Sequence, residues 1–229
     1  MDGPSASSKS TISRLVARRL GFNYVDSGAM YRAVTWKALT DGVNVQDAEQ
    51  VIALVERLKI QFEIVAGEAR MMIDGVYPGD AIRAPRVAEN VSIVAAMPEV
   101  RRILVEHQRS LTQFGSLVME GRDIGSVVFP DTPHKFYIEA NAAERAKRRQ
   151  KDYVAMQIPT STEGVARSLA RRDKLDSSRP VAPLQIAPGA TVVDNSRNTP
   201  EQTAQIILDQ IAQQQRHPRR GTATIEGVE

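Results

Sequence analysis

Residues 1–11 read MDGPSASSKST, and from Gly3 to Ser10 they nearly match the pattern G-x-x-x-x-G-K-[ST] of a phosphate-binding loop. In such a loop, successive backbone N–H groups and the start of a helix face phosphate oxygens, the lysine binds the outer phosphates and the hydroxyl ligates Mg²⁺. Lys9 and Ser10 occupy these two positions, whereas Ser8 replaces the second glycine. We predict a nucleotide-binding loop made of Gly3, Pro4, Ser5, Ala6, Ser7, Ser8, Lys9, Ser10 and Thr11.

Ser8 is the first departure from the pattern. Glycine suits this position because the backbone passes close to the phosphates and needs a positive φ angle. Serine there costs about 1 kcal/mol of strain, but it removes no N–H donor, so we expect the loop to bind. The alternative is that residues 3–10 form a serine-rich tail. The helical spacing of apolar residues from Ile12 to Leu20, directly after Lys9, favours the loop.

The second departure is the absence of a hydrophobic strand before Gly3. A phosphate-binding loop normally follows a central strand of a sheet, and Met1-Asp2 supplies none. We expect that the start of the chain is truncated or misassigned. About six to eight apolar residues, the length of an ordinary strand, would then belong upstream of Asp2.

Length and composition fit one globular domain with a small insertion: 229 residues, of which 42% are hydrophobic. No apolar run of about 18 residues and no signal-peptide order occur, so we expect a cytoplasmic protein with no membrane partner. The absence of cysteine and three scattered histidines argue against disulfides and zinc. The net charge of +3 fits a protein that binds small anions in a cleft. Aromatic residues, on which the bases of single strands would stack, make up only 5% of the chain, so we expect no nucleic-acid partner.

Predicted helices and strands alternate along the rest of the chain. In residues 59–77 apolar residues alternate and Asp74-Gly75 favours a tight hairpin turn, so we expect a small inserted antiparallel sheet. The alternation elsewhere indicates a parallel sheet covered on both faces, with ligands at the carboxyl ends of its strands. The predicted strands cover residues 22–25, 116–120, 135–140 and 191–196. The predicted helices cover residues 9–20, 27–39, 51–58, two segments split at Pro98, 141–156, 165–178 and 200–215. A capping box at residues 199–202 begins the last of these helices.

Four stretches resemble the signature blocks of bacterial cytidylate kinases, in that family's order and spacing: DGPSASSKST (residues 2–11), DSGAMYRAVTWKA (26–38), EGRDIGSVVFP (120–130) and RRDKLDSSRPVAPL (171–184). The resemblance covers residues 2–215. It implies an α/β fold: a P-loop NTP hydrolase-like parallel sheet with helices on both faces, a small inserted domain that binds the nucleoside monophosphate, and an arginine-rich lid. We therefore expect one domain over residues 1–215, with its core at 1–58 and 86–215, the insert at about 59–85, the lid at about 141–160 and a disordered tail at 216–229.

The resemblance also implies an activity: transfer of a phosphoryl group from ATP to CMP or dCMP by a protein that acts as a monomer. Mg²⁺ is the implied cofactor, with Ser10 as its direct ligand and with Asp26 or Glu120 holding its waters. Lys9 would bind the outer phosphates of ATP. The lid residues implied in catalysis are Arg145, Arg148 and Arg149.

The implied binding site for CMP has three parts. The base would be read by an acceptor and donors, because cytosine presents an amine beside two acceptors. The phosphate would be bound by arginines, whose planar fork suits a dianion. The implied residues are Ser92, Arg101 and Asp123 for the base, Ser27, Tyr31, Arg32, Arg122 and Arg179 for the phosphate, and Arg172 and Asp176 for the sugar.

Several of these residues have a simpler explanation. Arg101 also fits a solvated charge on a helix, and Arg172 and Asp176 fit a surface ion pair four residues apart. The basic run at 145–149 fits a solvated helix face, and Glu120 fits a charge at a strand end.

Three other functions stay open on the sequence alone. The first is a P-loop kinase for another small acceptor. The second is a non-catalytic nucleotide-binding paralogue, which Ser8 and the absent first strand both favour. The third is a nucleic-acid binder, whose affinity would fall steeply with salt.

Overall fold

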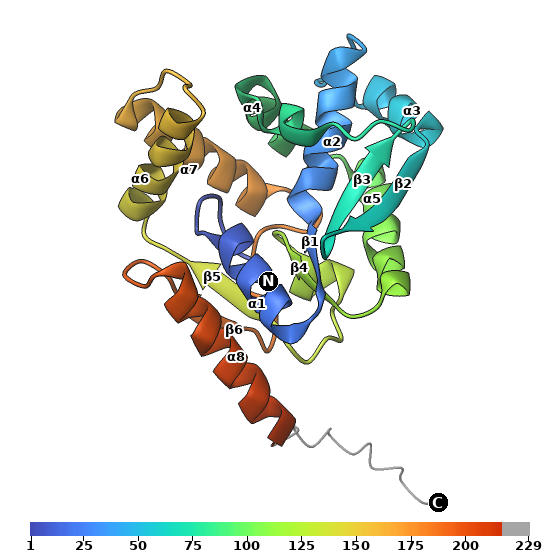
Figure 1. The fold of residues 1–229 in the computed structure, drawn as a ribbon. Coiled ribbons are helices and arrows are strands. Elements are labelled where there is room, and N and C mark those ends of the chain that lie inside the picture. Colours follow the sequence, from blue (N-terminus) through green and yellow to red (C-terminus); the bar gives the residue numbers. More distant parts are fainter. Residues whose placement is uncertain (217–229) are drawn as a thin grey trace, which may run out of the picture.

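The computed structural model describes residues 1–216 and has an α/β architecture (Figure 1). The predicted disordered tail lies outside the described residues from 217 onward, and Arg216 ends a helix. The strands are β1 (Asn23–Asp26), β2 (Ile60–Val65), β3 (Glu68–Ile73), β4 (Leu117–Glu120), β5 (Phe136–Glu139) and β6 (Thr191–Asp194). The helices are α1 (Lys9–Leu20), α2 (Ser27–Thr40), α3 (Ala48–Arg57), α4 (Pro85–Val94), α5 (Pro98–Ser110), α6 (Ala142–Ala155), α7 (Thr162–Ser178) and α8 (Pro200–Arg216), with 3₁₀ turns at Gly79–Arg83 and Leu111–Phe114 and a π-helical turn at Ile124–Val128.

The strands form two sheets. One has the order β2-β3-β1-β4, and the other pairs β5 with β6. β1 runs parallel to β4, and β5 runs parallel to β6. The predicted parallel arrangement of these four strands is therefore confirmed.

Met1 and Asp2 connect the two sheets. Met1 pairs with the end of β4: its amine donates to the carbonyl oxygen of Met119 (2.7 Å), and its carbonyl oxygen accepts from the N–H of Gly121 (2.9 Å). Asp2 pairs with β5 in parallel register with Tyr137. The expectation that Met1-Asp2 contributes nothing to the sheet is therefore wrong, because these two residues fill the central strand position from which the loop departs.

A mainly apolar pocket of about 340 Å³ lies beside Met1, between β4 and β5. Val118 and Phe136 line it from the two strands, and Ile211 lines it from α8. The expectation of apolar residues upstream of Asp2 stays a prediction.

Helices cover both faces of the sheet. Tyr24 and Val118 point into one hydrophobic cluster, which α1 and α8 complete. Their neighbours Val25 and Met119 point into the other, which α2, α3, α4 and α5 complete. Because successive residues of a strand face opposite sides, the two clusters lie on opposite faces. None of the helices in residues 1–216 is both long and apolar enough to cross a membrane.

The pair β2-β3 confirms the predicted antiparallel pairing, but it is part of the four-stranded sheet rather than a separate small one. Its connecting turn is Ala66-Gly67, with φ angles of 51° and 78°, rather than Asp74-Gly75. Asp74-Gly75 forms a second tight turn of the same kind, between Ile73 and Val76. β3 also pairs with β1, so this hairpin extends the main sheet.

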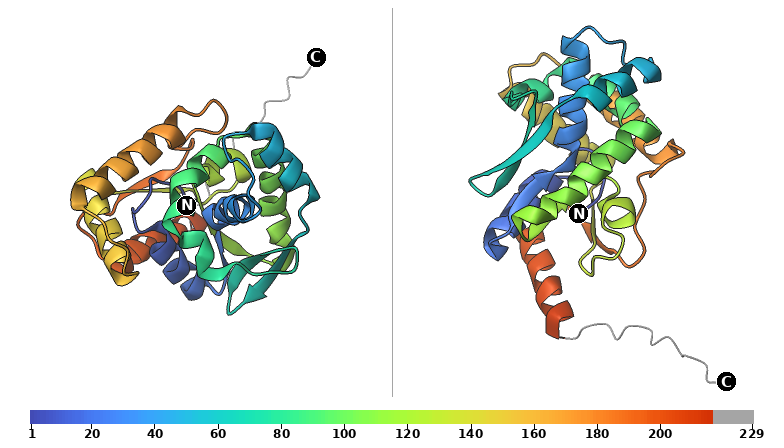
Figure 2. Two further views of the ribbon diagram at one scale, coloured as in Figure 1. Left: turned by 90° about the horizontal axis from the view of Figure 1, so that it is seen from above. Right: turned by 90° about the vertical axis from the view of Figure 1, so that its right-hand side faces the viewer.

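Figures 1 and 2 show α6 and α7 as a pair that stands beside the core, across from α2 and α4. The predicted capping box of α8 is confirmed: the N–H of Thr199 donates to Oε1 of Gln202 (2.8 Å), and the N–H of Gln202 donates to Oγ1 of Thr199 (3.2 Å).

The close approach of Gly3 to β5 predicts that no side chain is tolerated there. Gly3 has a φ of +144°, and a Cβ atom would lie 2.1 Å from the carbonyl oxygen of Ile138. We expect Gly3→Ala to lower the free energy of unfolding by more than about 2 kcal/mol in chemical denaturation, because the backbone must shift.

Gly21→Ala is the matched control. Its φ is +68°, and no heavy atom of the described residues lies within 4 Å of the added Cβ. We expect a loss of about 1 kcal/mol, from backbone strain alone. Equal losses for the two variants would contradict this account of Gly3.

Candidate active site

The loop after Asp2 ends at Ser8, and α1 begins at Lys9. Ser8 has φ 67° and ψ 18°, so the expected positive φ is confirmed. Its carbonyl oxygen accepts the first helical hydrogen bond, from the N–H of Ile12 (3.1 Å). Serine thus keeps the backbone path of a glycine, at a cost in strain.

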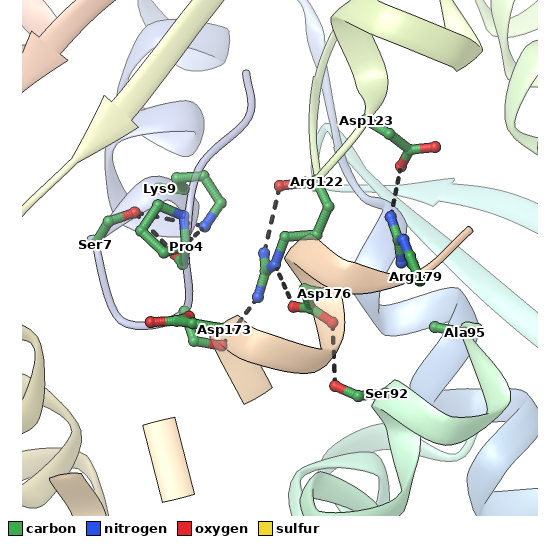
Figure 3. Close-up of polar contacts among 12 residues, drawn as sticks. Pro4, Ser7, Lys9, Ser92, Ala95, Arg122, Asp123, Asp173, Asp176 and Arg179 are labelled. Carbon is green, nitrogen blue, oxygen red and sulfur yellow. Dashed lines mark hydrogen bonds and ion pairs between the residues drawn. The ribbon is translucent and has the colours of Figure 1, made fainter. Parts of the chain in front are cut away.

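The Lys9 side chain points back into the loop (Figure 3). Nζ donates to the carbonyl oxygen of Pro4 (2.7 Å) and lies 3.4 Å from Oγ of Ser7. Burial, followed by the charge of Arg122, lowers the pKa of Lys9 from 10.5 to about 7. A bound anion would favour the charged amine and raise this pKa again.

One cleft of about 510 Å³ opens beside the loop. It brings together residues from the loop, from the first turn of α2, from α4 to α7 and from the end of β4. Of the predicted site residues, Gly3, Pro4, Ser7 and Arg145 do not line it. The predicted residues that do are Ser5, Ala6, Ser8, Lys9, Ser10, Thr11, Ser27, Tyr31, Arg32, Ser92, Arg101, Arg122, Asp123, Arg148, Arg149, Arg172, Asp176 and Arg179.

Arg101 from α5 and Arg179, directly after α7, converge on Asp123. Nη2 of Arg101 donates to Oδ2 of Asp123, and Nη2 of Arg179 lies 3.9 Å from Oδ1. The Arg101 guanidinium also lies 5.5 Å from the ring centroid of Tyr31. Burial raises the pKa of Asp123, and the two arginines oppose that shift. Arg101 is only 3% exposed, so the alternative of a solvated helix charge is wrong.

Asp176 connects α4, α7 and the end of β4 (Figure 3). Oδ1 accepts from Oγ of Ser92 (3.1 Å), and Oδ2 accepts from Nε of Arg122 (2.9 Å). Nη2 of Arg122 in turn donates to Oγ of Ser5 (2.9 Å). Because Asp176 is 5% exposed and pairs with Arg122, the alternative of a surface ion pair with Arg172 is wrong. Burial, followed by Arg122, lowers the pKa of Arg172 to about 10.

The first turn of α2 is fixed by Asp26 and Ser27. Oδ1 of Asp26 accepts from the N–H of Ala29 (2.8 Å), and Oδ2 accepts from Nη2 of Arg32 (2.7 Å). Oγ of Ser27 donates to the carbonyl oxygen of Glu120 (2.7 Å). These bonds hold Arg32 at the cleft and join α2 to the end of β4.

The three predicted lid arginines lie on α6, but their side chains do not all line the cleft. Arg148 and Arg149 line the cleft. Nη1 of Arg145 donates to Oδ2 of Asp173 (2.6 Å) and to the carbonyl oxygen of Ser5 (3.2 Å). Arg145 therefore ties α6 to α7 and to the loop. Its side chain is 11% exposed, which contradicts a solvated face.

Asn195 is a contact of the loop that the sequence did not reveal. It is fully buried, and its Nδ2 donates to the carbonyl oxygen of Ser7 (2.8 Å). Its carbonyl oxygen accepts from Nη2 of Arg148 (2.6 Å), and its Oδ1 accepts from Oγ1 of Thr203 (2.7 Å). Asn195 thus joins the loop and α8 through its side chain, and α6 through its backbone carbonyl oxygen.

Four guanidinium nitrogens around the cleft are buried without a hydrogen-bond partner among residues 1–216. A buried N–H group without an acceptor costs about 1–3 kcal/mol, so these groups favour a ligand that carries several anionic oxygens. They are Nε of Arg32, Nη1 of Arg148, Nε of Arg172 and Nη2 of Arg179.

The groups available to a cation are few. Residues 1–216 hold no cluster of three or more His, Cys, Asp or Glu side chains that could bind a metal ion. Ser10, Asp26 and Glu120 line the cleft. Glu120 is the last residue of β4, is buried, and accepts from the hydroxyl of Tyr24 through Oε1 (2.7 Å). This sparse oxygen set fits Mg²⁺, which keeps several waters and is completed by substrate phosphates.

Arg14, Arg83 and Tyr153 also line the cleft and were not predicted. Arg14 lies one helical turn after Ser10, so helical spacing could have identified it. Arg83 ends the 3₁₀ turn before α4, and its place depends on how this turn packs against α2. No local pattern predicts that contact.

Comparison with known proteins identifies similar chains over most of the sequence. A family model described as cytidylate kinase matches residues 1–213. The cytidylate kinase of Caldanaerobacter subterraneus subsp. tengcongensis is 38% identical over 211 residues, which is 92% of each chain. That of Clostridioides difficile is 39% identical over 211 residues, covering 92% of this chain and 96% of the relative. That of Limosilactobacillus reuteri is 42% identical over 200 residues, covering 87% and 88%.

The left-handed backbone at Ser8 predicts that glycine is better tolerated there. We expect Ser8→Gly to leave the protein as stable or to stabilise it by up to about 1 kcal/mol in chemical denaturation, because strain is relieved. Ser168→Gly, within α7, is the control and should destabilise by about 0.5–1 kcal/mol. A clear loss of stability in Ser8→Gly would show that the serine is not strained.

Proposed function

Because this chain belongs to the cytidylate kinase family, we propose that it transfers the terminal phosphoryl group of ATP to CMP or dCMP, giving ADP and CDP or dCDP. The single observation that carries the proposal is the cleft, which joins the phosphate-binding loop to a buried Asp123–Arg101 pair. The end of the cleft at the phosphate-binding loop suits a triphosphate, and the end at the Asp123–Arg101 pair suits a base with a hydrogen-bonding edge. A kinase for a nucleoside monophosphate needs both in one cavity.

The acceptor base is selected by buried polar groups. Asp123 accepts from the exocyclic amine of cytosine, and Arg101 and Ser92 donate to its ring acceptors. Uracil presents an oxygen to the carboxylate and an N–H to the arginine, so its binding leaves buried groups unpaired. All three residues are less than a tenth exposed, which makes that mismatch costly.

The acceptor phosphate meets several positive groups. Arg32, Arg122 and Arg179 bind it, with Ser27 and Tyr31 as hydroxyl donors, and Arg172 and Asp176 contact the sugar. Arg122 is already hydrogen-bonded to Ser5 of the loop, so the site for the acceptor phosphate is adjacent to the site for the phosphates of ATP. Because the two sites are adjacent, the attacking oxygen of CMP is held near the terminal phosphate of ATP.

Transfer itself depends on positioning and charge, and the attacking oxygen belongs to CMP. Lys9 and the loop amides hold the donor phosphates. Arg148 and Arg149 neutralise charge that develops on the transferred group, while Arg145 acts through the position of α6. Ser10 would hold Mg²⁺ directly, and the ion would supply positive charge beside the donor phosphates. Waters of the ion would be held by Asp26 or Glu120.

No comparison points to the alternatives of another acceptor, a non-catalytic paralogue or a nucleic-acid binder. The cofactor Mg²⁺, a monomeric state and a cytoplasmic location stay predictions. So do the absence of membrane and nucleic-acid partners and the boundaries of insert and lid.

A coupled assay with ATP and Mg²⁺ tests the proposed function. Each of CMP, dCMP, UMP and AMP is offered in turn. We expect phosphorylation of CMP and dCMP, with kcat/KM for UMP lower by about tenfold or more, because uracil leaves buried groups unpaired. Good turnover of UMP or AMP together with none of CMP would overturn the assignment, and ATP binding without any turnover would favour the non-catalytic alternative.

The lowered pKa of Lys9 predicts that ATP binding takes up a proton. Above about pH 7 the free amine is mostly neutral, whereas beside the triphosphate it is charged. Calorimetry in buffers of different ionisation enthalpy should detect uptake approaching one proton at about pH 8. Lys9→Arg is the control, since a guanidinium stays protonated and should remove the uptake. Equal proton uptake by both proteins would show that Lys9 is charged before ATP binds.

A further inference from the structure

Asp2 is a buried carboxylate that the proposed mechanism does not use. It is 4% exposed. Its N–H donates to the carbonyl oxygen of Phe136 and its carbonyl oxygen accepts from the N–H of Ile138, both at 2.8 Å. Its backbone is therefore fixed on β5, directly before the phosphate-binding loop.

The side chain of Asp2 caps a turn that is far away in the sequence. Oδ1 accepts from the N–H of Ile124 (2.7 Å), and Oδ2 accepts from the N–H of Gly125 (2.8 Å). These two amides open the π-helical turn Ile124–Val128. The first N–H groups of a helical turn have no partner within it and need an outside acceptor.

That acceptor would ordinarily be the residue before the turn, here Asp123. Aspartate is among the preferred residues at such positions because its carboxylate can bind the amides that follow. Asp123 makes no such bond in this structure. Its carboxylate instead pairs with Arg101 at the cleft. Asp2 thus supplies the cap, and Asp123 is left to face the cleft.

We propose that Asp2 is a positioning residue for acceptor specificity: by capping the turn Ile124–Val128, it keeps the Asp123 carboxylate directed at the base. Local side-chain bonds to the backbone compete with longer-range ones. Without the Asp2 carboxylate, Asp123 turns to cap its own turn, and Arg101 loses its partner. This inference rests on the proposed function, in which Asp123 reads the cytosine amine.

Asp2→Asn tests the inference with little change in shape. The Asn oxygen can accept from one amide, but its NH₂ group cannot accept from the other. We expect KM for CMP to rise and the ratio of kcat/KM for CMP over UMP to fall by about tenfold or more, while KM for ATP changes less than about twofold. The wild-type protein is measured beside it with both monophosphates.

Leu54→Ala is the control for a purely structural effect. Leu54 is 1% exposed in α3 and does not line the cleft, so its truncation lowers stability without touching Asp123. Both variants are assayed well below their melting temperatures. We expect Leu54→Ala to keep the wild-type preference for CMP over UMP. If Asp2→Asn also keeps it, Asp2 is only a structural cap and the inference is overturned.

Asp2→Glu covers the case in which Asp2→Asn does not fold. It keeps the charge but moves the carboxylate by one methylene, so the two amides are no longer held together, and the preference for CMP should again fall. Unchanged preference in a folded Asp2→Glu protein would overturn the inference. A wild-type protein that ignores CMP would instead overturn the proposed function, so the two failures are distinguishable.

Discussion

The arrangement of the active site depends on the backbone pairing of Met1 and Asp2 between β4 and β5. Met1 bonds to β4 on one side, and Asp2 bonds to β5 on the other. Within residues 1–216, no other strand lies between the two sheets. This pairing fixes where the loop leaves the sheet, and Gly3 allows the loop to pass within contact distance of Ile138. The direction of α1 and the place of Lys9 follow from that start.

Charge is the second organising feature of the site. Arginines from α2, α5, α6 and α7 surround the cleft, and three of its carboxylates are already hydrogen-bonded to arginines. Asp26 holds Arg32, Asp123 holds Arg101, and Asp176 holds Arg122. Each acid therefore orients an arginine without neutralising the cleft as a whole. Removal of one acid would leave a buried charge without a partner, which usually costs more than the pair contributes.

The sequence predicted the local features well. The spacing after Lys9, the strand–helix alternation, the capping box at Thr199 and the positive φ at Ser8 all follow from short-range rules, and all are present. Interactions between segments that are distant in the sequence were harder to predict. Arg101 and Asp123 were assigned to the base-binding site through the family resemblance. The spacing of residues along a helix does not predict which residue of another element a side chain contacts. The bonds of Asp2 to Gly125 and of Asn195 to Ser7 span more than a hundred residues and left no pattern in the sequence.

The bond between Lys9 and the carbonyl oxygen of Pro4 has a consequence for ligand exchange. Arg122 and Arg145 likewise rest on protein oxygens at the loop, those of Ser5. At these three side chains, entry of a ligand is therefore a displacement reaction, in which an incoming oxygen replaces an internal one. A single small ion such as chloride can displace one contact at a time and gains little. A polyphosphate carries several oxygens on one covalent chain and displaces several contacts at once, so the chelate effect favours it over single small anions.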